Sequence, residues 1–440
     1  MNKFLQDLKT NILVFDGSKG TMLQKMGLAA EECPELWNLK HPEKVKELYA
    51  SYIEAGSDVI QTNTFGANRS VLEKFNLQDK VSEINSASVR LAKEAAGNRA
   101  YVAASIGPTG KLLEPSGDLT FEQAYNVFKE QVISVTQAGA DIINFETITD
   151  LCEMRAAILA ARENSPLPII ASMTFEPNGY TLMGNSPATC ALVCQSLGVD
   201  LIGANCSTGP ESLLEITKQF HSFSSLPLSV KANAGLPLCS GDNITYNETP
   251  ETFKSTVNDF IESGVRLIGG CCGTTPEFIS AIKDELSNFN PAGFTIQGKP
   301  SPGSFICSAT RYINLENIKD IDLVFLIDDT NVETFEKELS EDNMDLIADR
   351  VLDISSNDAR AIYLNLNMAG KSHLIVPVVK TIQTYSKLPL IFQPAEPALL
   401  ESALRIYNGK AGVLLGNSID ENTFDLIFLA KKYGSTVIYD

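Results

Sequence analysis

Short apolar runs alternate with longer amphipathic stretches along the first two thirds of the chain. The runs are rich in β-branched residues and apolar at consecutive positions, which is typical of parallel strands buried on both faces. The stretches between them, such as 42–56 and 152–164, have apolar residues three and four positions apart, which predicts helices that cover a sheet. The predicted strands are 12–17, 58–64, 101–107, 141–147, 168–175, 200–206, 227–235 and 266–273.

Eight strand–helix units in residues 1–286 predict a (β/α)8 TIM barrel. The alternative is a doubly wound open sheet, which usually has fewer strands. A second feature favours the barrel, because barrel active sites lie at the carboxyl ends of the strands. Nearly every predicted strand ends in a residue type that carries chemistry: Asp16, Asn63, Glu146, Thr174, Cys206, Asn233, Cys271 and Cys272.

Proline and glycine interrupt the pattern in residues 287–304, and we interpret this segment as a linker. Residues 305–440 resume the α/β alternation with six short apolar runs, too few to close an ordinary barrel. The sequence therefore predicts a (β/α)8 barrel followed by a smaller α/β domain that resembles part of a second barrel.

The charge and cysteine content narrow the class of protein. Lys and Arg number 35 against 54 Asp and Glu, and the formal net charge of −19 argues against nucleic-acid binding. No apolar run is long enough to cross a membrane, and Asp7 and Asp16 come too early for a secretory signal. Nine cysteines are too few for a disulfide scaffold, which favours a reducing, cytoplasmic location where clustered cysteines indicate metal binding or catalysis.

Three cysteines form a candidate metal site. Cys206 ends the sixth predicted strand, whereas Cys271 and Cys272 end the eighth, so in a barrel only one strand separates them. Glycines on both sides of the pair relax the rule that neighbouring side chains point to opposite faces. Three thiolates suit Zn²⁺ with an open fourth position. The alternative is that these are buried structural cysteines.

Such a site favours one kind of chemistry. Zn²⁺ with three thiolates carries a formal charge of −1, which makes it a poor source of hydroxide but a good holder of a substrate thiolate. Lowering a thiol pKa by about two units takes roughly 2.7 kcal/mol, which metal ligation readily exceeds. The expected reaction is alkyl transfer to a thiol. The three histidines all lie away from strand ends, so neither a histidine zinc site nor a histidine base is expected.

Several motifs resemble the homocysteine S-methyltransferase family, in particular the N-terminal homocysteine-binding module of cobalamin-dependent methionine synthase. The resemblance runs in order through about residues 10–286. The motifs are DGSKGT (16–21), TNTFGA (62–67), SIGPTG (105–110), NFET (144–147), GANCSTGP (203–210), ANAG (232–235) and GGCCGTTP (269–276). It implies a barrel that holds Zn²⁺ through Cys206, Cys271 and Cys272, with the homocysteine sulfur as the fourth ligand and methionine as the product.

The same resemblance implies roles for other residues. Glu146 would bind the homocysteine amino group, and Asn233 would lie near the metal and occupy its open position before substrate arrives. The loop with Asp16, Gly20 and Thr21 would lie against the amino-acid end of the substrate, since main-chain N–H groups at a helix start suit a carboxylate. The alternatives are that Glu146 caps a helix and that Asp16 only makes a turn.

Asn63 is a further candidate for substrate binding, and the alternative is that it only hydrogen-bonds within the rim of the barrel. It ends the second predicted strand and so would lie at the same rim as the other candidates.

The methyl donor is less constrained. Residues 305–440 resemble the first half of the pterin-binding barrel of methionine synthase but lack acidic partners for a pterin, so folate binding is not expected. The alternative is a degenerate domain kept for packing or docking. The chain has no Asp-x-His-x-x-Gly cobalamin motif. We therefore expect methylcobalamin on a separate corrinoid protein, with S-methylmethionine as the alternative donor. Methyl transfer to another thiol and a non-enzymatic subunit of a complex are further alternatives.

Overall fold

The computed structural model describes most of the chain in two compact units. The first unit comprises Met1–Pro187 and Val199–Gly298, and the second comprises Ala188–Gly198 and Lys299–Asp440. The predicted linker lies almost entirely outside the described residues. The described residues are 2–206, 209–240, 243–287, 303, 305–316, 323–327, 343–356, 359–366, 372–394, 396–416 and 421–439.

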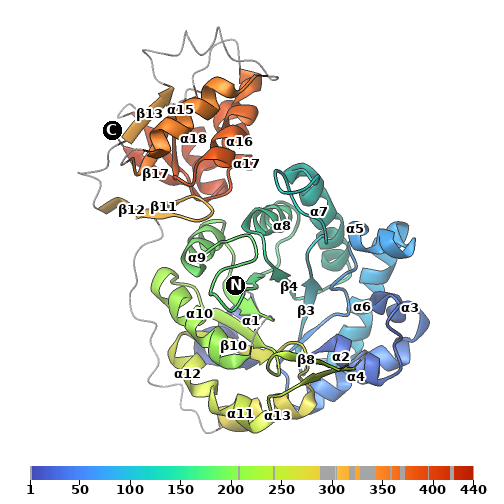
Figure 1. The fold of residues 1–440 in the computed structure, drawn as a ribbon. Coiled ribbons are helices and arrows are strands. Elements are labelled where there is room, and N and C mark those ends of the chain that lie inside the picture. Colours follow the sequence, from blue (N-terminus) through green and yellow to red (C-terminus); the bar gives the residue numbers. More distant parts are fainter. Residues whose placement is uncertain are drawn as a thin grey trace. The chain divides into compact units, whose positions relative to one another are not determined.

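The first unit is a barrel of eight parallel strands (Figure 1). The strand order is β1-β10-β7-β6-β5-β4-β3-β2, and a parallel bridge between Phe15 and Val59 joins the two ends of this sheet. The predicted TIM barrel is confirmed, and the open sheet is excluded. The strands are β1 Leu13–Val14, β2 Val59–Gln61, β3 Tyr101–Ile106, β4 Ile142–Ile148, β5 Ile169–Met173, β6 Leu201–Asn205, β7 Leu228–Ala232 and β10 Val265–Gly270.

Amphipathic helices surround the barrel (Figure 1). Local sequence sets where they begin: Thr120 and Gln123 form a capping box at the start of α7, and prolines stand in the first turns of α4 and α10. The helices that follow the strands in sequence are α2 Lys19–Lys25, α3 Trp37–Lys40, α4 Pro42–Glu54, α5 Arg69–Leu72, α6 Val81–Ala96, α7 Phe121–Gln137, α8 Leu151–Asn164, α9 Pro187–Ser196, α10 Pro210–Phe223, α11 Pro250–Ser255, α12 Val257–Glu262 and α13 Pro276–Ser287. Of these, α9 is grouped from its second residue onward with the second unit.

Helix α1 (Lys3–Thr10) closes one end of the barrel. Its Phe4 and Leu8 are buried in a core cluster with residues from seven of the eight strands or their ends, among them Val59, Ile142 and Leu267. These three residues lie near the amino ends of their strands. The opposite, carboxyl end of the barrel is therefore the end available for a site, as in other barrels of this kind.

An antiparallel hairpin follows β7 and does not belong to the barrel sheet. It consists of β8 (Pro237–Ser240) and β9 (Asn243–Tyr246). The sequence pattern did not predict this hairpin, because its two strands are short and their residues are mixed in polarity.

The second unit contains five parallel strands that follow one another in sequence order, β13-β14-β15-β16-β17. This is the order found in an arc of a (β/α)8 barrel, and it confirms the smaller α/β domain. A hairpin, β11 (Phe305–Cys307) with β12 (Tyr312–Asn314), precedes the sheet. The other elements are β13 Leu323–Ile327, β14 Ala361–Asn365, β15 Leu390–Gln393, β16 Gly412–Leu415, β17 Thr436–Tyr439, α15 Asp345–Ser356, α16 Ile375–Tyr385, α17 Pro397–Ile406 and α18 Glu421–Lys432.

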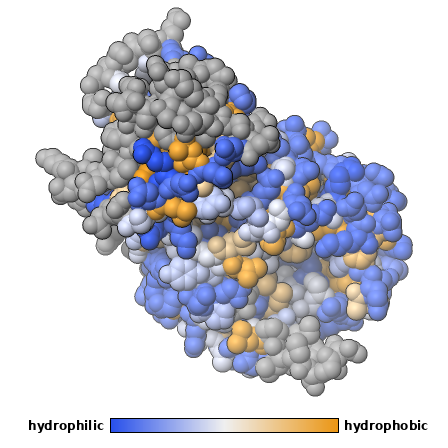
Figure 2. Space-filling view, turned by 45° about the horizontal axis from the view of Figure 1, so that its top comes forward, coloured by the Kyte–Doolittle hydropathy of each residue, from blue (hydrophilic) through white to orange (hydrophobic). Residues whose placement is uncertain are grey.

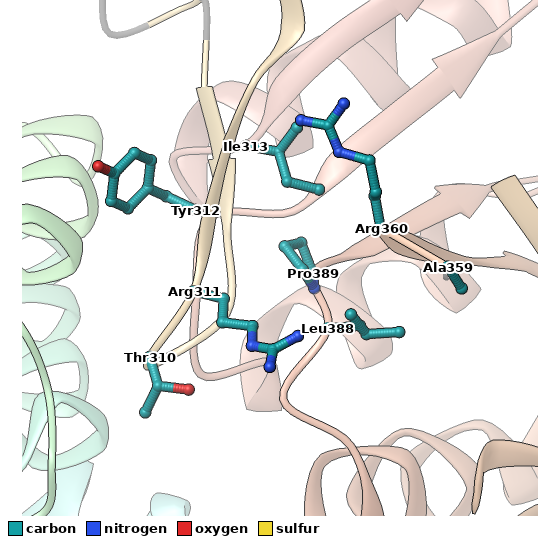
Figure 3. Close-up of a pocket in the computed structure, with 8 residues that line it drawn as sticks. All are labelled: Thr310, Arg311, Tyr312, Ile313, Ala359, Arg360, Leu388 and Pro389. Carbon is teal, nitrogen blue, oxygen red and sulfur yellow. The ribbon is translucent and has the colours of Figure 1, made fainter. Parts of the chain in front are cut away.

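The second unit also has a pocket of about 370 Å³ (Figure 3). Arg311, Arg360, Leu388 and Pro389 are among the residues that line it. The pocket lies where β14 and β15 begin. Ligands of parallel α/β sheets normally bind at the carboxyl ends of strands, so this pocket is not where the sheet alone would place a site.

The face in Figure 2 is mainly hydrophilic, with small and separate hydrophobic groups. Among the described residues, no helix combines the length and the apolar character that a membrane span needs.

Candidate metal centre and substrate site

The structure brings the three predicted metal ligands together. The Sγ atoms of Cys206, Cys271 and Cys272 all lie within 4.8 Å of one another, and those of Cys206 and Cys272 are 3.7 Å apart. Two ligands of a tetrahedral zinc ion with Zn–S bonds of about 2.3 Å stand about 3.8 Å apart. The cluster is therefore consistent with a zinc site. All three cysteines are partly exposed.

The backbone after β6 and after β10 adopts unusual conformations, which turn the three sulfurs toward one another. Cys206 has a left-handed φ of 62°, and its N–H donates to the Lys231 carbonyl at 3.1 Å. Cys271 is held from β7, since its N–H donates to the Ala232 carbonyl at 2.7 Å. Gly273 has a φ of 80°, a conformation that favours glycine. These turns let adjacent cysteines face the same side, as the glycine pattern predicted.

Neighbouring polar groups fix the cysteine pair. Asn233 is buried, and its Oδ1 accepts a hydrogen bond from the Cys272 N–H at 3.1 Å. Thr21 Oγ1 accepts one from the Gly273 N–H at 3.2 Å. Asn205 Nδ2 donates to the Cys271 sulfur at 3.7 Å. Two of the predicted substrate residues, Asn233 and Thr21, therefore lie directly beside the cluster.

Without a cation, the Cys206 sulfur disfavours ionisation of the Cys271 and Cys272 thiols. Hydrogen bonding with the Cys206 sulfur raises the pKa of Cys271 to about 11, and burial adds to this effect. The same sulfur, together with Cys271, raises the pKa of Cys272. A divalent cation reverses this preference, because a coordinated thiol is deprotonated outright.

Tyr246 covers one side of the cluster. A Cβ atom at Gly273 would lie only 2.4 Å from the Tyr246 ring, so the ring packs directly on this glycine. Burial, together with the three neighbouring cysteines, raises the pKa of Tyr246 to about 12. Tyr246 was not predicted as a site residue, because nothing in the sequence of its hairpin marks a site.

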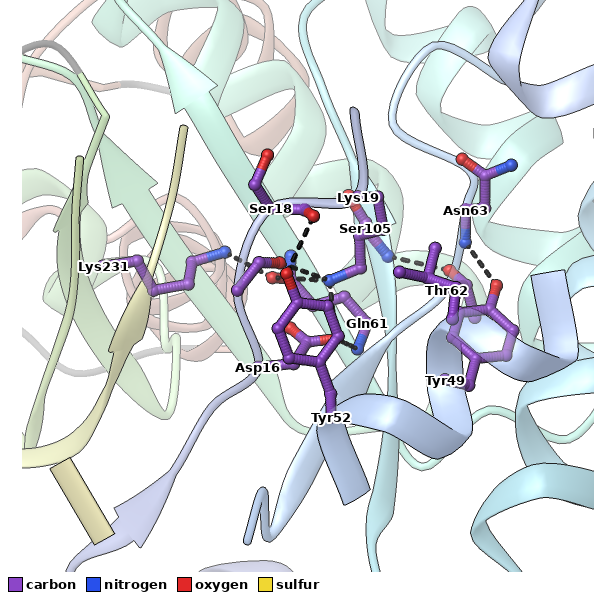
Figure 4. Close-up of polar contacts among 12 residues, drawn as sticks. Asp16, Ser18, Lys19, Tyr49, Tyr52, Gln61, Thr62, Asn63, Ser105 and Lys231 are labelled. Carbon is purple, nitrogen blue, oxygen red and sulfur yellow. Dashed lines mark hydrogen bonds and ion pairs between the residues drawn. The ribbon is translucent and has the colours of Figure 1, made fainter. Parts of the chain in front are cut away.

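Four charged side chains form a network in the barrel, of which Asp16, Glu146 and Lys231 are buried and Lys19 is partly exposed. Figure 4 shows Asp16, Lys19 and Lys231 of this network together with Gln61. Glu146 forms an ion pair with Lys231 and also accepts hydrogen bonds from Gln61 and Ser105. Asp16 forms an ion pair with Lys19 at 2.6 Å. The network carries no net charge, since it holds two carboxylates and two ammonium groups.

Gln61 joins the two ion pairs of this network. Its backbone N–H donates to Asp16 Oδ2 at 2.8 Å, its side-chain N–H donates to Glu146, and its Oε1 accepts from Lys231 Nζ at 2.9 Å. Burial raises the pKa of Asp16 and lowers that of Lys19, and in each case their mutual attraction opposes the shift. Within the described part of the chain, Asp16 Oδ1 has no hydrogen-bond partner.

The remaining candidates lie in different surroundings. Asn63 is buried, and its side-chain amide donates to the Pro34 carbonyl at 2.8 Å and to Asn38 Oδ1 at 3.2 Å. Asn63 therefore forms hydrogen bonds with the segment that precedes α4. Gly20 lies in the first turn of α2 and has no atom within 4 Å of where a Cβ would stand. The Thr21 N–H is already engaged by the Ser18 side chain at 3.2 Å.

Lys231, Gln61 and Asn205 were also missed from the sequence. Gln61 and Asn205 are the last residues of β2 and β6, and Lys231 lies within β7. A buried lysine is rare unless it is paired, so Lys231 in the run PLSVKANAG was a usable sign of a charged partner in the barrel.

Comparisons with known proteins agree with this geometry. Methionine synthase of Mycobacterium tuberculosis is 27% identical over 462 residues, which cover 99% of this chain and 38% of that protein. Methionine synthase of Mycobacterium leprae is 26% identical with the same coverage. The chain thus spans less than half the length of these relatives.

Solved structures show the same fold. The metallated form of the homocysteine methyltransferase MmuM from Escherichia coli aligns with 64% of this chain and 98% of its own, at a TM-score of 0.55 and 23% identity. The oxidized form of that protein is 25% identical at a TM-score of 0.54. The pattern of the homocysteine S-methyltransferase family matches residues 13–286. The chain belongs to the homocysteine S-methyltransferase family.

Proposed function

We propose that this protein transfers a methyl group to the thiolate of homocysteine, giving methionine, at a zinc ion held by Cys206, Cys271 and Cys272. The observation that carries the proposal is the convergence of the three sulfurs at distances that suit one tetrahedral ion. When bound, zinc would supply a deprotonated and nucleophilic substrate sulfur at neutral pH.

The chain's own residues would orient the substrate. The Glu146 carboxylate suits the α-ammonium group, and it already accepts three donors in the barrel interior. Asn233 stands next to the cysteines, where its side chain can occupy the open position before substrate binds. Thr21 lies beside Gly273, which places the loop after β1 next to the cluster.

The reaction is a displacement at the methyl carbon. A bond forms between the homocysteine sulfur and the methyl carbon, and the bond between that carbon and the donor breaks with its electron pair retained by the donor. The product is a neutral thioether, which is a weaker metal ligand than a thiolate and can therefore leave. The donor we favour is a methylated corrinoid on a separate protein, and S-methylmethionine is the alternative.

The second unit corresponds, in this proposal, to the region that follows the homocysteine module in methionine synthases. Support comes from the alignment with the mycobacterial proteins, which extends over 99% of this chain. A role in docking the donor protein is compatible with this correspondence.

The proposal is tested by measuring zinc and methionine formation on the full chain. We expect about one zinc per chain, and loss of zinc in each of Cys206→Ala, Cys271→Ala and Cys272→Ala. Cys152→Ser is the matched control, because this free cysteine lies outside the cluster. Zinc that remains bound in all three variants would contradict the proposed metal site.

A second experiment compares several methyl donors in order to identify the one that the protein uses. Zinc-loaded protein is given homocysteine with free methylcobalamin, S-methylmethionine, betaine or methyltetrahydrofolate, and methionine is measured. Cysteine, coenzyme M and selenohomocysteine replace homocysteine under the best donor. Zinc-bound protein that turns over no donor with any acceptor would favour a non-enzymatic subunit instead.

A further inference from the structure

The carboxylate proposed to bind the substrate ammonium already has a cationic partner. Glu146 forms an ion pair with Lys231, and the side chains of the two residues are 8% and 1% exposed. The Lys231 Nζ also donates to Gln61 Oε1 at 2.9 Å and lies 4.8 Å from the centre of the Phe15 ring. A substrate ammonium that approaches Glu146 must therefore share this carboxylate with Lys231 or displace it.

Displacement alone would leave a buried charge without a partner. Such a charge is costly, because the protein interior solvates it poorly. The network is neutral as it stands, so an ammonium that entered without an anion would add one uncompensated positive charge. Homocysteine avoids this cost, since its α-carboxylate is separated from its α-ammonium by a single carbon and enters with it.

Lys231 is better placed than Lys19 to take that carboxylate. Lys19 is held by Asp16 at 2.6 Å and by the Gly17 carbonyl at 3.3 Å, and it also donates to Gln61 Oε1 at 3.4 Å, whereas Lys231 forms the ion pair with Glu146. Lys231 stands in β7 between the two strands that carry the cysteines, where it pairs with Asn205 of β6 and Gly269 of β10. Its flexible four-carbon stem allows the ammonium to change partner without moving the strand.

We propose that Lys231 is a specificity-determining residue that binds the α-carboxylate of the thiol substrate, exchanging Glu146 for it when the substrate ammonium reaches Glu146. This inference rests on the proposed function. It predicts that the site selects ligands with both an ammonium and a carboxylate, because either group alone leaves one member of the Glu146–Lys231 pair uncompensated.

Binding measurements on the zinc-loaded full chain test this selection. Isothermal titration compares methionine with methioninol, which lacks only the carboxylate. In Lys231→Met we expect methionine affinity to fall by at least about 30-fold, the size of effect seen when one partner of a buried charge pair is removed. Methioninol affinity should not fall, because Glu146 then has no lysine to exchange for the ligand ammonium, and Lys231→Arg should restore part of the preference for methionine. Lys93→Met is the matched control, because Lys93 pairs with Asp141 outside this network, and it should not separate the two ligands.

A purely structural role gives a different result. If Lys231→Met weakens methionine and methioninol by the same factor, or leaves methionine unaffected, the inference is wrong. If Lys231→Met does not fold, the single variant Glu146→Gln is compared with the double variant that combines Glu146→Gln with Lys231→Met, in which neither residue is charged. A lower methionine affinity in the double variant than in the single variant supports the inference.

A crystal structure of the unaltered protein with methionine or homocysteine gives the direct answer. Lys231 Nζ within hydrogen-bond distance of the ligand carboxylate supports the inference, whereas Lys231 still paired only with Glu146 overturns it. Failure of the unaltered zinc-loaded protein to bind either amino acid would instead count against the proposed function.

Discussion

Asn205 hydrogen-bonds the Cys271 sulfur at 3.7 Å and at the same time holds Thr147 through both atoms of its amide. Asn205 Nδ2 donates to Thr147 Oγ1, and Asn205 Oδ1 accepts from the Thr147 N–H, each at 2.8 Å. Thr147 has a left-handed φ of 59° and directly follows Glu146. One side chain thus connects the metal cluster to the strand end that carries the proposed ammonium-binding carboxylate.

Asn205→Ala should therefore weaken the metal site although Asn205 is not a ligand. Partners that orient ligands typically contribute about 10–100-fold in metal affinity. We expect a loss of that size in zinc affinity, measured by competition with a chromogenic chelator. Asn63→Ala is the control, because its side chain bonds Pro34 and Asn38 instead. The control should lose stability, by about 1–3 kcal/mol, but keep its zinc affinity. Equal zinc affinity in both variants would contradict this role of Asn205.

Gly270→Ala should disturb the turn that carries the cysteine pair. Its Cβ would stand 2.2 Å from Thr274 Oγ1, which itself donates to the Cys271 carbonyl at 2.6 Å. Relieving this overlap must move Thr274 and with it the Cys271 backbone. We expect about 1–3 kcal/mol lower stability, as is usual for overpacking, together with weaker zinc binding. Chemical denaturation and chelator competition measure the two effects.

Gly20→Ala separates a structural from a substrate role at Gly20. A Cβ there meets no atom within 4 Å, and the position lies in the first turn of α2. Stability should stay the same or rise slightly, and zinc affinity should not change. If the loop lies against the amino-acid end of homocysteine, the KM for homocysteine rises in this variant. An unchanged KM would place the substrate away from Gly20.

Tyr246→Ala should expose the cysteines in the metal-free protein. The ring packs on Gly273, next to Cys272. Since thiol reactivity follows access as well as pKa, we expect a several-fold faster reaction with a disulfide reagent. Tyr246→Phe keeps the ring and should react at nearly the original rate. A fast reaction in both variants would mean that the hydroxyl, not the ring, protects the thiols.

The sequence predicted the barrel because each strand is an apolar run that a helix must cover. All eight predicted runs overlap an observed barrel strand, and the cysteines at the ends of β6 and β10 converge as expected. Strand ends are readable in this way since parallel strands place their carboxyl ends at one rim.

Three features could not be predicted from the sequence, and the first depends on pairing across the barrel. Lys231 and Glu146 are 85 residues apart, and only the closed sheet shows that they meet. The β8–β9 hairpin and its Tyr246 were missed because they follow no long apolar period. The grouping of Ala188–Gly198 with the second unit also has no local signature.

Glu153 makes the stability of the barrel depend on pH. Its carboxylate is buried and accepts hydrogen bonds from the Thr109 N–H at 2.7 Å and from the Thr109 hydroxyl at 2.6 Å, which anchors the loop after β3. Burial raises the pKa of Glu153 from 4.5 to about 7, against the effect of these two bonds. The folded protein therefore retains a proton that the unfolded chain releases above its own, lower pKa.

The contribution of Glu153 to stability is complete below about pH 4.5 and is lost as the pH rises through about 7. This loss amounts to about 3 kcal/mol of the free energy of unfolding. Glu153→Gln does not titrate, and its Oε1 can still accept both bonds from Thr109, so its stability should lack this component of the pH dependence. Denaturant unfolding of both proteins between pH 4.5 and 8 measures the difference. Parallel curves over this range would show that Glu153 is ionised in the folded protein.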